Sequence, residues 1–382
     1  MKKICAASCG DVKTILIVAT LTTIGLIMVY SSTAFSCIKG EGKDLIFLKK
    51  QALSVAIGML LCMLISKIDY HIWGKYSPLL LGIAIILLFY VVVFSPPIHG
   101  VRRWIKIRNF SLQPAEFTKF LVIMYVAKFL ASSKKLTDTR ELIPLLFVLG
   151  TVFYLLVREP CFGVIAVLFT VILGMLFISG MKLSYLILIL AFGSLILFFA
   201  INQVAYAKAR LWQFLSGGSS QLMQSLVSLG AGGIFGVGLG NSSGKLFLLP
   251  TPHTDFMFSV MGEEIGLLGC LGVLFLFLLL LIRGVKIGMK SKDLLGTFLS
   301  IGIVLSIFVS AVFHVGVACG ILPTTGVPLP FISYGGNALV ANLMAIGILL
   351  NIYKQNVAYK NESNYSNWRN RRPYFRRNLV GR

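Results

Sequence analysis

Long apolar runs alternate with short polar segments along almost the whole chain. A helix needs about 20 predominantly apolar residues to cross a bilayer. Ten runs approach this length, at residues 13–34, 47–66, 77–95, 112–131, 142–157, 161–179, 183–201, 258–282, 295–317 and 332–353. The pattern predicts an all-α fold, a polytopic membrane bundle of about ten transmembrane helices. Residues 1–353 would form one domain, followed by a basic tail at 354–382.

A short polar stretch leaves open whether the fifth and sixth runs form one kinked helix or two. Arg158, Glu159 and Pro160 separate these runs. Both ends of the chain are basic, and positively charged segments tend to remain on the cytoplasmic side of a membrane. Two cytoplasmic ends require an even number of spans, so the two runs are predicted to be separate helices.

The composition supports an integral membrane protein. Of the 382 residues, 57% are hydrophobic and 13% are charged, and the formal net charge is +22. This positive charge fits basic cytoplasmic loops, anionic lipid head groups and an anionic substrate. Nucleic acid is not an expected partner, because the sequence contains no soluble basic domain. The seven cysteines show no paired metal-ligand spacing, so we interpret them as small apolar residues.

The predicted topology places a long connection, residues 202–257, on the outer side. It contains many glycines and is much longer than the other outer connections. Long ordered loops often carry function. The tail at 354–382, by contrast, is polar and basic, and is expected to be unstructured on the cytoplasmic side.

One acidic residue stands where a membrane protein usually avoids charge. Asp255 follows a loop that contains Pro250 and Pro252, and it directly precedes an apolar run. A carboxylate at a membrane boundary is costly to desolvate and is usually functional. A general base is therefore one interpretation. An ordinary helix N-cap formed by Thr254 and Asp255 is the alternative.

A cluster of cations marks a second outer segment. Residues 102–108 contain four basic residues and no acid, and they also contain Trp104. Glu116 and Lys119, three residues apart, would share one face of the following helix. These charges fit either a self-neutralising pair beside an interfacial aromatic, or an anion-binding mouth. The excess of cations favours the second interpretation, because Arg and Lys are natural partners of phosphate oxygens.

A third outer segment, 320–337, contains three prolines and several glycines, so it cannot form one regular helix. Non-helical backbone at membrane depth is tolerated only where protein or a water-filled cavity surrounds it. We therefore expect a re-entrant loop rather than a plain connection. Because all three unusual segments fall on the outer side, they predict one outward-facing site in an enzyme that acts on an anionic, lipid-linked substrate.

These segments resemble the SEDS family, the polytopic proteins typified by RodA and FtsW. The similarity runs in family order from about residue 100 to 340. The matching motifs are Arg-Arg-Trp-Ile at 102–105, Gln-Pro-Ala-Glu-Phe-Thr-Lys at 113–119, Gln-Ser-Leu at 224–226, the glycine-rich 232–240, His-Thr-Asp-Phe at 253–256, Gly-Glu-Glu-Ile-Gly at 262–266 and Pro-Leu-Pro-Phe-Ile-Ser-Tyr-Gly-Gly at 328–336. The first two motifs look more like FtsW than RodA.

The resemblance implies a peptidoglycan glycosyltransferase that polymerises lipid II on the outer face of the bacterial cytoplasmic membrane, for cell division. It implies that Asp255 is the catalytic base, and that Arg103, Glu116 and Lys119 bind substrate. The other predicted substrate-binding residues, in or beside the motifs, are Gln224, Lys245, His253, Ser333 and Tyr334. No cofactor is firmly expected, although a divalent cation such as Mg²⁺ or Mn²⁺ would suit pyrophosphate departure.

Family members pair with a class B penicillin-binding protein, a transpeptidase, so the resemblance implies this partner and other division or elongation membrane proteins. Gly266, Gly269 and Gly272 recur on one span. Such small residues would let either a partner helix or a neighbouring helix of the bundle approach closely.

The chain departs from the family pattern in two places. Thr251 stands where a glutamate is usual, and Cys161 stands where an aspartate is usual. These departures put weight on Asp255, which is the only acid left in residues 241–258.

Three other functions remain open at this point. A lipid II flippase would also use cations in a membrane cavity, but it predicts charges deep in several spans. A scaffold that only recruits a partner leaves Asp255 unexplained. A RodA-type elongation polymerase would use the same chemistry as a division polymerase.

Overall fold

The computed structural model describes residues 11–33, 44–97, 101–107, 110–133, 139–217, 220–242 and 254–377. Long helices match all ten predicted runs: α2 (Val12–Thr33), α3 (Asp44–Ile65), α4 (Tyr70–Phe94), α5 (Pro114–Ser132), α6 (Thr139–Arg158), α7 (Phe162–Ile178), α8 (Leu183–Gln203), α12 (Met257–Met289), α13 (Leu294–Ala318) and α14 (Gly336–Arg377). A hairpin of β1 (Ile105–Ile107) and β2 (Phe110–Leu112) precedes α5. The predicted all-α bundle is confirmed.

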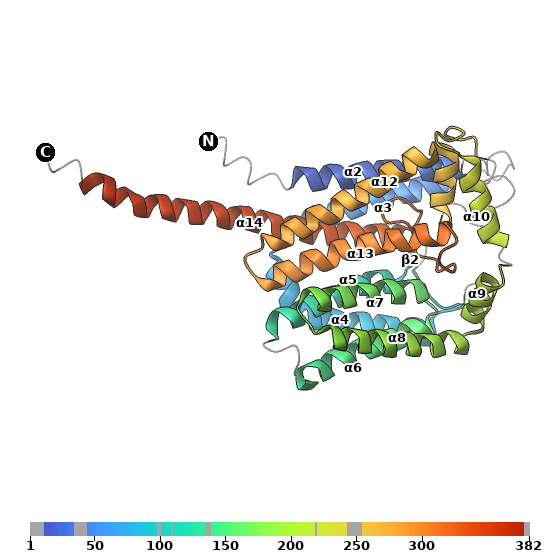
Figure 1. Cartoon of the computed structure of the whole chain (residues 1–382), viewed down its shortest axis with the longest axis horizontal. Helices are drawn as coiled ribbons and strands as arrows, with labels where there is room; N and C mark the ends of the chain where they lie inside the picture. Colours follow the sequence, from blue (N-terminus) through green and yellow to red (C-terminus); the bar gives the residue numbers. More distant parts are fainter. Residues whose placement is uncertain are drawn as a thin grey trace.

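Within the described residues, seven helices are long and apolar enough to span a membrane. The apolar parts of α6 and α7 are shorter, and α5 carries Glu116, Lys119 and Lys128. The structure separates α6 from α7, as the parity of the chain ends predicted. In Figure 1, α2 begins and α14 ends on the same side of the bundle. The exact number of crossings and the cytoplasmic placement of the ends stay predictions.

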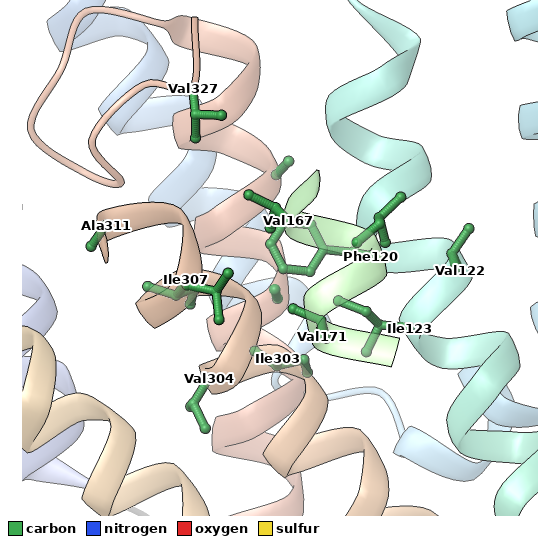
Figure 2. Packing of buried hydrophobic residues seen from close by; sticks show 14 of the residues in the cluster. Phe120, Val122, Ile123, Val167, Val171, Ile303, Val304, Ile307, Ala311 and Val327 are labelled. Atoms are coloured by element: carbon green, nitrogen blue, oxygen red, sulfur yellow. The ribbon is translucent and has the colours of Figure 1, made fainter. Parts of the chain in front are cut away.

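Helix α13 lies in the centre of the bundle. Figure 2 shows Ile303 and Ile307 of α13 among the side chains of α5 and α7, with Val327 at the end of the same cluster. Gly302 permits this close packing, since a methyl group there would lie 2.6 Å from Ile123 Cγ2 and 2.9 Å from Met175 Sδ. The core therefore extends directly to the segment that precedes α14.

Polar side chains join the helix ends at the opposite end of the bundle. The Tyr70 hydroxyl donates to Asp293 Oδ1 at 2.7 Å. The His71 ring lies 2.7 Å from Asp69 Oδ1 and 3.0 Å from Asp293 Oδ2. Asn351 of α14 accepts from the Tyr70 amide at 2.9 Å. These contacts fix α4, α13 and α14 to one another. On α14 they lie at Asn351, several turns after the first residue of the helix.

The structure differs from the sequence expectation in two segments. The described part of the connection 202–257 contains the helices α9 (Ala205–Leu215) and α10 (Ser220–Ala231), whereas only a loop was expected. The tail was expected to be unstructured, but α14 continues to Arg377 and extends beyond the bundle in Figure 1. No glycine or proline stands between Gly347 and Pro373 to stop this helix.

Candidate active site

The site is organised around the non-helical segment between α13 and α14, residues 319–335. Its residues Leu329, Phe331 and Ile332 are almost completely buried, as expected of a re-entrant loop. Arg210 of α9 donates to the Thr324 carbonyl at 3.0 Å. The loop also packs against α2, where a methyl group at Gly25 would collide with the Phe331 carbonyl.

His314 connects this loop to α12 and α13. Its Nδ1 lies 2.8 Å from the Val327 carbonyl, and the Phe258 amide donates to its Nε2 at 3.3 Å. A carbonyl can only accept, so the proton is assigned to Nδ1. The buried ring therefore uses both nitrogens to hold the loop beside the start of α12.

Asp255 lies in the turn immediately before α12 and is half-buried. The N-cap of α12 is Phe256, and no side chain caps it. No described residue forms a hydrogen bond with the Asp255 carboxylate, and a methyl group at Gly326 would lie 3.9 Å from its Oδ2. The helix-cap interpretation of Asp255 is therefore wrong. The carboxylate faces the re-entrant loop with its lone pairs available, as a general base requires.

Arg103 binds the turn between α6 and α7. Its Nε donates to the Glu159 carbonyl at 3.1 Å, and its Nη2 donates to the Pro160 carbonyl at 2.5 Å. The guanidinium is planar and always charged, and its Nε and Nη2 are both bonded to these carbonyls. Arg103 thus sits in the predicted cationic region, but it is also part of the scaffold.

Glu116 and Lys119 form the predicted pair in the first turns of α5. Lys119 Nζ lies 3.3 Å from Glu116 Oε2, and each side chain is only 6% exposed. Pro114 occupies the first turn, where its missing N–H costs nothing. Removal of either partner would leave an uncompensated buried charge, which is strongly destabilising.

Packing and electrostatic effects link the surroundings of this pair to the re-entrant loop. Thr325 and Val327 of the loop pack on Gly163, where a methyl group would lie 2.5 Å from Val327 Cγ2. The buried Cys161 lies two residues earlier, and the charges of Arg103, Glu159 and Glu116 affect the pKa of its thiol. The structure therefore brings the three predicted outer segments together at one end of the bundle.

Glu159 is a fully buried acid in the turn outside the α6 and α7 helices. Burial raises its pKa to about 8, although the Arg103 charge opposes that rise. Its Oε1 has no hydrogen-bond partner among the described residues. Oε2 accepts only a long contact from the Cys161 thiol at 3.9 Å.

The glycine-rich segment 232–240 supports the start of α12. The helix breaks at Gly266, where φ is 68°, a conformation that favours glycine. Backbone groups on both sides of the break bond to the glycine-rich segment. The Val237 amide donates to the Glu263 carbonyl at 2.9 Å, and the Leu267 amide donates to the Gly233 carbonyl at 3.0 Å. This motif thus fixes the short helical piece that follows Asp255.

The other predicted substrate-binding residues are placed less directly. Ser333 Oγ accepts from the Leu329 amide at 3.0 Å, and Tyr334 packs edge-on against Phe47 at 5.3 Å, so both stabilise the loop. Gln224 is half-buried on α10. His253 and Lys245 lie outside the described residues.

A divalent cation was considered as a cofactor, but the part of the chain that the structure describes contains no set of ligands for it. No group of three or more His, Cys, Asp or Glu side chains there is arranged to hold a metal ion. We therefore derive no step of the reaction through a metal.

Three contributors to the site were missed by the sequence analysis. His314 is an ionisable residue within an apolar run, which is itself a signal of function. Glu159 was considered only as a separator between runs. Arg210 carried no signal, because its partner is a backbone carbonyl more than a hundred residues away.

The fold and site together define a polytopic helical membrane protein with buried charges and with a carboxylate, beside a re-entrant loop, that no described residue binds. The FtsW/RodA/SpoVE family, described as "Cell cycle protein", matches residues 12–358. The chain therefore belongs to this family.

Similar proteins agree over most of the chain. Stage V sporulation protein E of Bacillus subtilis is 36% identical, covering 90% of this chain and 96% of its own. The probable peptidoglycan glycosyltransferase FtsW of Trichlorobacter lovleyi is 38% identical, covering 90% and 92%. These relatives are consistent with the FtsW-like motifs.

Solved structures share the fold. A chain of a peptidoglycan synthase complex, described as coordinating polymerization and crosslinking, superposes with a TM-score of 0.76 at 25% identity, covering 91% of this chain and 98% of its own. Rod shape determining protein RodA of Thermus thermophilus gives a TM-score of 0.70 at 25% identity, with the same coverages.

Proposed function

We propose that this chain is a peptidoglycan glycosyltransferase that polymerises lipid II on the outer face of the cytoplasmic membrane. The observation that carries the proposal is the Asp255 carboxylate, which caps no helix and lies against the re-entrant loop at Gly326. The names of relatives such as the probable peptidoglycan glycosyltransferase FtsW support the same reaction.

In the proposed reaction, Asp255 takes the proton from a sugar 4-hydroxyl of the acceptor lipid II. The resulting oxygen attacks the anomeric carbon of the donor, and the bond to the pyrophosphate breaks with inversion. A pyrophosphate leaves as a stable anion, so no general acid is needed to protonate it. Glycoside hydrolysis differs, since a second carboxyl usually protonates the leaving oxygen there.

The buried charges have distinct parts in this reaction. Arg103 is held by the Glu159 and Pro160 carbonyls, so its positive charge would act on the departing pyrophosphate without reorganising. Lys119 would add positive charge, and Glu116 fixes its position through the 3.3 Å contact. His314 orients the loop beside Asp255 rather than exchanging protons, since both ring nitrogens are already bonded.

A lipid II transporter is the main competing function. Purified protein incubated with fluorescent lipid II separates the two functions. A polymerase yields long glycan strands on its own, whereas a transporter needs a separate polymerase to produce them. Absence of polymer, together with movement of labelled lipid II across vesicle bilayers, would contradict the proposed reaction.

The family relationship also supports a transpeptidase partner, since a similar structure comes from a complex that couples polymerization to crosslinking. We propose a class B penicillin-binding protein. The glycines considered for its docking divide between two environments: Gly266 packs against Gly236, whereas nothing lies within 4 Å of a methyl group at Gly272. Gly272, rather than Gly266, is compatible with a partner helix.

We also propose that the protein acts at the division site, which fits the relatives named FtsW.

A further inference from the structure

The buried carboxyl of Glu159 has no part in the reaction as described so far. It is 0% exposed, and its Oε1 has no hydrogen-bond partner among the described residues. Other buried acids of the chain are satisfied differently: Ser242 donates to Glu263 at 2.5 Å, and Ser31 donates to Glu264 at 2.7 Å. An unpartnered buried carboxylate would be costly, so Glu159 is expected to be uncharged in the resting protein.

Glu159 also lies where its charge matters most. Arg103, which would face the pyrophosphate, donates from Nε to the backbone carbonyl of this same residue at 3.1 Å. The two side chains interact electrostatically, because the Arg103 charge lowers the pKa of Glu159 against the effect of burial. Ionised Glu159 would therefore compete with the substrate pyrophosphate for the positive charge of Arg103.

The remaining charged and titratable groups around Glu159 are few. Cys161, at the start of α7, places its Sγ 3.9 Å from Glu159 Oε2, and Glu116 of α5 acts on this same thiol. Lys119 is paired with Glu116. Arg158, at the end of α6, is exposed. Among the described residues, Arg103 is thus the cation whose charge lowers the pKa of the Glu159 carboxyl.

We propose that Glu159 is a positioning residue that controls how strongly the Arg103 charge acts on the substrate: protonated Glu159 leaves this charge to the pyrophosphate, and ionised Glu159 offsets it. This inference rests on the proposed glycosyl transfer. Glu159 itself touches no reacting atom. It acts by deciding whether Arg103 can offset the negative charge that develops on the leaving group.

A pH profile tests this role. With the pKa of Glu159 at about 8, the protonated fraction falls strongly between neutral and alkaline pH. The polymerisation rate of the purified wild-type chain on fluorescent lipid II should fall about tenfold from pH ~7 to pH ~9. Glu159→Gln, a neutral mimic of the protonated acid, should be active at neutral pH and lack this alkaline decline.

Two further variants sharpen the comparison. Asp69→Asn removes one carboxylate at the opposite end of the bundle, where the Asp69 side chain is 49% exposed, and should retain the wild-type decline. Lys119→Arg keeps a positive charge at alkaline pH. A decline that persists in Glu159→Gln would contradict the inference, and its disappearance in Lys119→Arg would assign the decline to Lys119 instead.

A second readout uses the wild-type protein alone, in case Glu159→Gln does not fold. Infrared spectroscopy should show the carbonyl band of a protonated carboxylic acid that is lost as the pH rises through about 8. Absence of that titration, or a flat wild-type profile to pH ~9, would overturn the role of Glu159 while leaving polymerisation intact. Absence of polymer at every pH would instead contradict the proposed function and this inference with it.

Discussion

At the scale of single residues, the site uses backbone atoms to hold its charged and polar side chains. Arg103 binds the carbonyls of Glu159 and Pro160, and His314 binds the carbonyl of Val327. Asp255 differs, because no described residue holds its carboxylate. A rigid frame around one uncommitted carboxylate is the arrangement expected of a preorganised general base.

Arg103→Ala should reduce the polymerisation rate by roughly tenfold or more, since a preorganised donor to the leaving group is lost. Lys106→Ala is the matched control, because Lys106 is an exposed cation three residues further along the same segment. It should retain most of the wild-type rate. Equal, mild losses in both variants, measured with fluorescent lipid II, would instead indicate a diffuse electrostatic funnel.

The sequence identified the charged side chains and the Glu116–Lys119 pair, but not the backbone partners of the site. Asp255, Arg103, Glu116 and Lys119 were all found because charge near a membrane is rare, and the Glu116–Lys119 pair followed from helical spacing. The carbonyl contacts of Arg103 and His314 have no sequence signature, because every residue has a carbonyl. Only the folded loop decides which carbonyls meet them.

At the scale of elements, the break in α12 is the main departure from regular structure. Gly266 has a φ of 68° and packs against the backbone at Ile234 and Gly236. Hydrogen bonds from Val237 and Gly238 to the carbonyls of Glu263 and Glu264 close this junction. The short helical piece that begins after Asp255 is thereby fixed to the glycine-rich segment.

Gly266→Ala should destabilise the protein by about 1–3 kcal/mol, because an added methyl group would collide with backbone and the residue would have to keep a positive φ. Gly272→Ala, on the same helix, has open space around the new methyl group and should be neutral or slightly stabilising. Thermal unfolding in detergent measures both. Equal melting temperatures would show that the junction contributes little.

Hydropathy predicted the long helices because each is a sustained apolar run. It missed α9 and α10, which are shorter and more polar than the spans. The break at Gly266 was also missed, since the surrounding residues are apolar on both sides and only the tertiary contact with 232–240 requires it.

At the scale of the whole molecule, the two ends of the bundle have different character. One end holds Asp255, the re-entrant loop, α9 and α10, while the other holds the Tyr70, His71 and Asp293 network. Figure 1 shows α9 and α10 on the side opposite the start of α2. With the positive-inside rule, this arrangement predicts that the site lies on the outer face.

Cysteine labelling tests that orientation. In a background without the native cysteines, Ser216→Cys should react with a membrane-impermeant thiol reagent added to intact cells, whereas Lys290→Cys should not. Both positions are exposed, the first after α9 and the second after α12. The reverse labelling pattern would place the site on the cytoplasmic face and contradict the proposed function.

The most direct test of the central claim is the polymerisation of fluorescent lipid II by purified Asp255→Asn. The amide keeps the shape of the side chain but cannot accept the proton of the attacking hydroxyl. Because Asp255 caps no helix, the variant should fold and insert normally. We expect no detectable polymer from a protein that melts at the wild-type temperature. Polymer formation at a rate near that of the wild type would contradict the assignment of Asp255 as the catalytic base.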